Sequence, residues 1–159
     1  MNKDKLDTVM KYISSAFESV SLELAESEYK KADSLSIDEE NSVAVIIGIA
    51  GTMKGRIILH SGLKTAYGFT KIMNCGDPLD KKEDLFLYMA EFANMICGRS
   101  TTYINNEFKE RKLWLTPPAI FAGKNLQLVT PTVCSEQLFF SGDKGKFILD
   151  VGFEEGKKS

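Results

Sequence analysis

The sequence predicts an α+β domain with a mainly antiparallel β-sheet and long amphipathic helices packed on it. Helical periodicity marks three segments, and pairs of β-rich runs joined by glycine-containing turns lie between and after them. Strand pairs that alternate with helices are typical of this class. The 159 residues favour a single domain spanning 1–159, and 43% hydrophobic residues are enough to form a core.

The first two helices are predicted from apolar residues that recur every three to four positions. Residues 63–74 form the shorter one, which ends where Cys75–Pro78 supplies glycine and proline. Residues 4–21 form the longer one, and its apolar side consists of Leu6, Val9, Met10, Ile13, Phe17 and Val20.

The third helix is predicted from about Lys82 to about Asn106. One stripe of this helix is expected to be buried, and it consists of Phe86, Met89, Ala90, Ala93, Ile96, Cys97, Ser100 and Ile104. The opposite, exposed stripe carries Leu87, Glu91, Asn94, Gly98 and Asn105.

The central hairpin of the sheet is predicted from a β-branched run at residues 42–50. A turn bounded by glycines follows at 51–55, and residues 56–60 return as the partner strand. The polar segment 23–41 precedes this hairpin and holds one edge strand at most, near Leu24–Ala32.

The C-terminal part of the sheet is predicted from three further signals. Leu113–Pro118 starts a strand at an edge, because its two prolines lack an amide donor. Leu126–Val129 is a short strand. Val133–Phe140 and Lys146–Phe153 form a hairpin around the turn at 141–145.

Composition excludes several classes of function. A net charge of −2 without a basic stripe argues against nucleic-acid binding. One histidine and three cysteines without a CxxC pair argue against a zinc site and a disulfide framework, so we expect a cytoplasmic protein. No apolar run approaches the roughly 20 residues that span a bilayer, so we expect no membrane partner. The one histidine, His60, closes a strand and is given no catalytic role.

Glu91 and Asn94 form the candidate functional pair. Residues at i and i+3 project from one side of a helix, roughly 60° apart. Leu87 lies one turn before Glu91, where an exposed leucine is out of place unless a partner covers it. Gly98 lies one turn after Asn94 and costs roughly 1 kcal/mol relative to alanine, which favours close approach of another backbone. Together these residues predict a docking surface with chemistry at its centre.

The spacing of these residues carries a family resemblance. Pro117 follows Asn94 after twenty-two intervening residues. The stretch from Met53 to Pro118 resembles the CheX/CheC/FliY phosphatases of bacterial chemotaxis, whose signature is Asp or Ser, three residues, Glu, two residues, Asn, twenty-two residues, Pro. Glu91, Asn94 and Pro117 match it, whereas Leu87 replaces the Asp or Ser. The helix at 63–74 lacks a Glu-x-x-Asn, so the resemblance is closest to the CheX branch, with one active face per chain.

The resemblance implies a CheC-like fold and a phosphatase that hydrolyses the aspartyl phosphate of a CheY-type response regulator. Asn94 would orient the attacking water, and Glu91 would pair with the regulator's lysine. Leu87 and Gly98 would belong to the docking surface, and Pro117 would have an architectural role. This chain would bind no cofactor of its own, because the regulator supplies Mg²⁺.

The resemblance also implies a homodimer formed through sheet edges, and an unprotected edge near Leu126–Phe140 would suit it. Two alternatives to an enzyme remain. The first is a non-catalytic module that docks a response regulator or another signalling protein, which Leu87 favours. The second is a structural dimer in which the pair of Glu91 and Asn94 is incidental.

Overall fold

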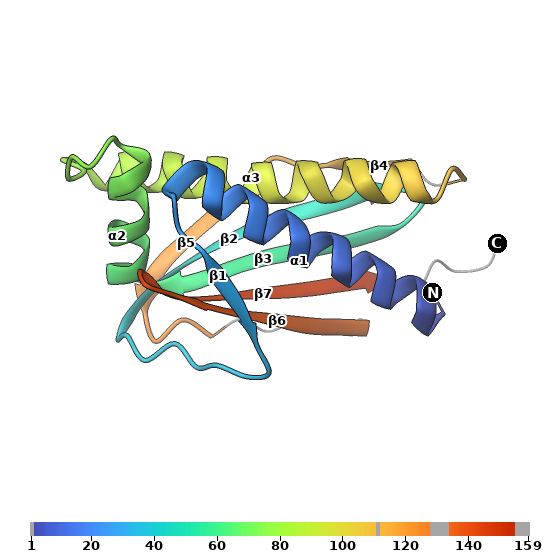
Figure 1. Ribbon diagram of the computed structural model, residues 1–159, viewed down its shortest axis with the longest axis horizontal. Helices are drawn as coiled ribbons and strands as arrows, with labels where there is room; N and C mark the ends of the chain where they lie inside the picture. Colours follow the sequence, from blue (N-terminus) through green and yellow to red (C-terminus); the bar gives the residue numbers. More distant parts are fainter. Residues whose placement is uncertain (1, 111, 128–133, 155–159) are drawn as a thin grey trace.

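Three helices cover one face of a single seven-stranded sheet in the computed structural model, which describes residues 2–110, 112–127 and 134–154 (Figure 1). Every strand pairing among these residues is antiparallel. The predicted α+β class is therefore confirmed. No helix in the described part of the chain combines the length and apolar character needed to cross a membrane.

The three helices lie where the periodicity predicts them. The first begins after Asn2, whose side chain accepts a hydrogen bond from the Lys5 amide at 2.9 Å, and it ends before Glu26, which has a left-handed backbone. It extends beyond the predicted residue 21. The helices are α1 (Lys3–Ala25), α2 (Leu63–Met73) and α3 (Lys82–Glu107).

The strands form the order β1-β6-β7-β3-β2-β4, and β5 also pairs with β2. The strands are β1 (Tyr29–Ala32), β2 (Asn41–Gly51), β3 (Lys54–Gly62), β4 (Leu113–Leu115), β5 (Ala119–Lys124), β6 (Cys134–Gly142) and β7 (Gly145–Glu154). Both predicted hairpins, β2–β3 and β6–β7, are confirmed.

One predicted strand is wrong. The strand expected at Leu126–Val129 lies earlier, at β5; Leu126 and Gln127 belong to no strand, and 128–129 lie outside the described residues. The two prolines interrupt the pairing of the outer strand with β2 after β4. The chain nevertheless continues alongside β2, so pairing resumes directly after Pro118 as β5. The polar segment does contain an edge strand, but α1 occupies its predicted first residues, and β1 starts only at Tyr29.

The predicted unprotected edge at Leu126–Phe140 is wrong in part. Phe139 and Phe140 pair with Ala32 and Lys31 of β1, and β6 pairs with β7 on its other side. Within β6, residues 134–138 pair with β7 alone among the described strands, and residues 128–133 of the predicted edge lie outside the described residues.

The core lies between the helices and the inner face of the sheet. In the central strands Ile47 faces Ile57, which faces Val151, and all three side chains are buried. Six aromatic side chains from α1, α2, α3, β1, β6 and β7 meet above these strands. This aromatic cluster consists of Phe17, Tyr29, Phe69, Phe92, Phe140 and Phe147.

The outer face of the sheet, away from the helices, carries polar groups on β3 and β7. Successive strand residues point to opposite faces, so Arg56, His60 and Asp150 share this side. Each has a buried side-chain nitrogen or oxygen without a hydrogen-bond partner in the described structure. Burial lowers the pKa of His60, because a charged imidazole would lose its hydration there.

The N-terminus of α2 is capped by a side chain that is distant in sequence. Gly62 lies at the N-cap position and has no side chain to cap the helix, so the Glu39 carboxylate caps it instead. It accepts hydrogen bonds from the Lys64 amide and the Thr65 hydroxyl, each at 2.6 Å. A Cβ on Gly62 would overlap this carboxylate, so the glycine is required by the cap.

We predict that Glu39→Ala lowers the free energy of unfolding by about 1–2 kcal/mol, because it leaves amide donors of α2 without their acceptor. Urea unfolding measures this change. Asp33→Ala removes an exposed carboxylate from the same connection and serves as the control, with an expected change within about 0.5 kcal/mol. Equal effects of the two substitutions would contradict the capping role.

We predict that stability falls as the pH drops from 7.5 to 5.5, through the ordinary histidine pKa near 6.5. The unfolded chain then binds a proton that the folded chain resists at His60, so protonation favours unfolding. His60→Gln should flatten this part of the curve of unfolding free energy against pH. Parallel curves for the two proteins would show that His60 is not responsible.

Candidate functional site

The rotation of α3 about its axis is set by Phe92. This side chain is fully buried in the aromatic cluster, with ring centroids 4.4 Å from Phe69 and 5.6 Å from both Phe17 and Phe147. Adjacent helix residues lie about 100° apart, so burial of both Phe92 and Ala93 leaves Glu91 on the solvent side.

The observed buried side of α3 is therefore rotated about the helix axis relative to the predicted buried stripe. Leu85 and Phe92 are fully buried although the stripe omitted them, whereas Phe86 and Ala90 are only half-buried. The reason is that α3 packs against α1 and α2 as well as the sheet, which shifts and widens its apolar side.

The candidate pair is open to an incoming molecule. Glu91 is exposed and Asn94 is half-buried, and neither side chain makes a hydrogen bond or ion pair within the described residues. Leu87, one turn earlier, is 69% exposed, the highest value among the large hydrophobic residues that the structure describes. A Cβ at Gly98 would meet nothing within 4 Å, so crowding within the chain does not explain this glycine.

Asn105 has a different environment from the rest of the predicted exposed stripe. Its side chain accepts from the Leu113 amide at 3.0 Å and donates to the Leu113 carbonyl at 3.1 Å. Asn105 lies three turns after Asn94 and on the same flank of the helix. It ties that flank to the start of β4, which is consistent with the half-burial of Asn94.

Pro117 lies in an interruption between β4 and β5. Residues 47–48 of β2 are opposite three residues, 116–118, so the outer strand bulges by one residue. Thr116 holds the bulge, because its amide donates to the Gly48 carbonyl and its hydroxyl accepts from the Gly48 amide, each at 2.9 Å. Pro117 is exposed and needs no donor there, which fits an architectural role.

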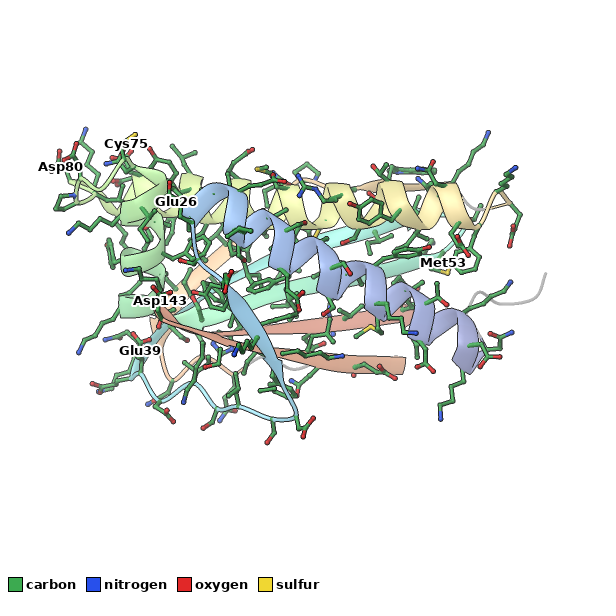
Figure 2. All side chains as sticks on the ribbon, viewed as in Figure 1. Glu26, Glu39, Met53, Cys75, Asp80 and Asp143 are labelled. Carbon is green, nitrogen blue, oxygen red and sulfur yellow. The ribbon has the colours of Figure 1, made fainter. Side chains whose placement is uncertain are left out.

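A groove of about 490 Å³ borders Glu91 on the side toward α2. It lies between α3 and the connection from α2 to α3, whose tip carries Cys75 and Asp80 (Figure 2). The residues lining it are Asn74, Pro78, Leu79, Asp80, Asp84, Leu87, Tyr88 and Glu91.

Sequence reasoning missed most of this groove. Asp84 has a usable signal, because it lies seven residues before Glu91, two turns earlier on the same stripe. Asn74 and Asp80 have no such signal, since a folded connection brings them to α3.

The face of α3 toward α1 is fixed by a bidentate ion pair. Arg99 donates to both carboxylate oxygens of Glu23 at 2.8 Å, and one of its nitrogens also donates to the Ser19 hydroxyl at 2.9 Å. The hydrogen bond from Arg99 lowers the pKa of Glu23. On the buried side, desolvation raises the pKa of the Cys97 thiol to about 12. Neither group is therefore free to act at the exposed pair.

Comparison with known proteins decides the family. The family model described as chemotaxis phosphatase CheX matches residues 43–141, which include Glu91, Asn94 and Pro117. The chain belongs to the CheX family. The resemblance based on the spacing of these residues is thus confirmed at the level of the family. No functionally curated protein matches the chain.

Solved structures of CheX and FliY share the fold. The chemotaxis protein CheX of Desulfovibrio desulfuricans is 19% identical over 92% of this chain and 99% of that one, with a TM-score of 0.79. FliY of Thermotoga maritima is 12% identical over 96% and 91%, with a TM-score of 0.68. CheX of Borrelia burgdorferi, solved in complex with CheY, BeF₃ and Mg²⁺, is 25% identical over 92% and 97%, with a TM-score of 0.72.

We predict that Asn105→Ala destabilises the protein by about 1–3 kcal/mol, because both backbone groups of Leu113 lose a partner where α3 meets β4. Thermal or urea unfolding measures the change. Asn106→Ala removes the neighbouring, exposed amide and should leave stability within about 0.5 kcal/mol. A similar loss of stability in both variants would show that the two hydrogen bonds between Asn105 and Leu113 are not responsible.

Proposed function

We propose that the protein hydrolyses the aspartyl phosphate of a CheY-type response regulator. One observation carries the proposal: α3 presents Glu91 and Asn94 to solvent without partners in the described chain. Membership of the CheX family and the complex of the Borrelia burgdorferi CheX with CheY support a regulator as the partner.

Asn94 is proposed to orient the attacking water. Phosphoryl transfer passes through a loose transition state, so placing the water in line with phosphorus is the main task left to a second protein. A neutral carboxamide suits this task, because it accepts from and donates to water without adding negative charge beside the phosphate. Its half-buried position limits its freedom and so lowers the entropic cost of holding the water.

Glu91 is proposed to pair with the regulator's lysine and so to fix the docked geometry. Leu87 and Gly98 flank the pair along α3; the first offers apolar area, and the second leaves room for the partner's backbone. Pro117 lies in the bulge that Thr116 holds and is proposed to act only through the architecture of the site.

The regulator is proposed to supply Mg²⁺, so this chain needs no cofactor of its own. A covalent intermediate on this chain has no support near the pair. Cys97 lies on the buried side of α3 with its thiol neutral, and His60 lies on the opposite face of the sheet.

The compartment and the oligomeric state complete the proposal. Free thiols at Cys75 and Cys97 are consistent with the reducing cytoplasm. A homodimer is proposed through a sheet edge, and the stretch of β6 before Phe139 offers one.

A second function, docking without hydrolysis, is favoured by one observation. Leu87 is an exposed apolar side chain at the position where the family signature has Asp or Ser. Such a surface binds a partner without contributing a polar group to chemistry. Turnover separates the two functions, because an enzyme accelerates phosphate loss in catalytic amounts and a binder does not.

We predict that Asn94→Ala lowers kcat about 10²–10³-fold with little change in KM, because the water loses its orienting group. Glu91→Ala should raise KM as well as lower kcat, because it removes a docking contact. Phosphate release from a regulator phosphorylated with acetyl phosphate and Mg²⁺ measures both constants.

Asn106→Ala provides the control for this assay, since it removes an exposed amide at the far end of the same helix. Full activity of Asn94→Ala would refute the catalytic assignment. Protection of the phosphoryl group by the wild-type chain, or loss only in stoichiometric amounts, would establish the binding function instead.

A further inference from the structure

The groove beside Glu91 has a floor that no part of the described chain covers. Leu87 lies on this floor and is 69% exposed, and Pro78 and Leu79 add apolar surface from the connection between α2 and α3. Water-exposed leucine area of this kind is removed from water when a partner docks.

The polar lining of the groove has one sign of charge. Asp80, Asp84 and Glu91 contribute three carboxylates, no lysine or arginine lines the groove, and none of the three forms an ion pair in the described structure. No three His, Cys, Asp or Glu side chains of the described residues are placed to hold a metal ion. The three carboxylates give the groove a negative charge that attracts a cationic group.

The wall of the groove is already formed without a partner. The Tyr88 hydroxyl donates to the Asn74 side chain at 2.9 Å, and Asn74 donates to the Asp77 carbonyl at 3.1 Å. The Gly76 amide closes the end of α2 by donating to the Lys71 carbonyl at 2.9 Å. A wall held by these bonds needs little ordering on binding, which favours affinity.

We propose that this groove, called here the acidic groove, receives a second basic side chain of the response regulator. The inference rests on the proposed function and extends it from the chemistry to the choice of partner. The aliphatic stem of a lysine or arginine lies on Leu87, and its cationic head lies between Asp80 and Asp84.

The second basic side chain is distinct from the lysine that pairs with Glu91. Asp84 precedes Glu91 by seven residues, which is about 10 Å along a helix. One ammonium group cannot contact both carboxylates at that distance. The regulator that fits therefore carries two basic groups about 10 Å apart, one beside its phosphorylated aspartate and one on a neighbouring loop or helix end.

The acidic groove acts on association and selectivity, and the chemical step depends on Asn94. Opposite charges across an interface raise the association rate and penalise partners that lack the complementary charge. Salt screens these charges, so the contribution of the groove decreases as ionic strength rises.

The test compares steady-state dephosphorylation by the wild-type chain and by the double variant Asp80→Asn/Asp84→Asn. KM for the phosphorylated regulator should rise about tenfold in the variant, and its kcat/KM should depend less on salt. Leu87→Ala should also raise KM but should leave the salt dependence as in the wild type, because it removes apolar area only.

Two controls keep the outcome clear. Asp7→Asn/Glu18→Gln removes the same charge from exposed positions of α1, outside the groove, and should behave as the wild type. Asp84 lies in the first turn of α3, where a carboxylate favours the helix, so the melting of each variant is measured. Asp80→Asn alone, outside any helix, keeps the test valid if the double variant unfolds.

An unchanged KM and salt dependence in a folded Asp80→Asn/Asp84→Asn variant would overturn the acidic groove while leaving the role of Asn94 intact. Absence of turnover by the wild-type chain would instead refute the proposed function. In that case titration with a beryllofluoride-activated regulator tests the groove alone: about tenfold weaker binding by the variant supports it, and equal binding refutes it.

Discussion

Burial of Phe92 in the aromatic cluster is the constraint on which the proposed functional face of α3 depends. The ring contacts side chains from α1, α2 and β7, so rotating α3 would break contacts with three elements at once. The cost of removing such a side chain, about 3–5 kcal/mol, is a large part of the stability of a single domain. Because the helix cannot rotate, Glu91 and Asn94 keep their direction relative to solvent.

Both ends of α3 are fixed by hydrogen bonds as well. Asn105 joins the C-terminal part to the start of β4, and Tyr88 joins the N-terminal part to the connection after α2. The exposed residues between these points lie on a helix held at both ends, so a partner docking there would meet them already arranged. Such preorganisation lowers the entropic cost of docking and of holding a water molecule in line.

Local patterns in the sequence predict much of this structure. The three helices and two hairpins follow from residue periodicity and glycine-containing turns, and the spacing of Glu91, Asn94 and Pro117 identifies the family. What the sequence does not predict depends on contacts between distant segments. Examples are the rotation of α3, the capping of α2 by Glu39, the bulge that places β5 after Pro118, and the groove closed by Asn74.

The central claim is that the outward side of α3 is the surface that meets the phosphorylated regulator. Amide NMR spectra of the ¹⁵N-labelled chain, recorded while a beryllofluoride-activated regulator with Mg²⁺ is added, test it most directly. The account predicts that the largest shifts fall between residues 84 and 98 and in the connection at 74–80. Shifts confined to the outer face of the sheet, around Arg56 and Asp150, with α3 unchanged, would contradict it.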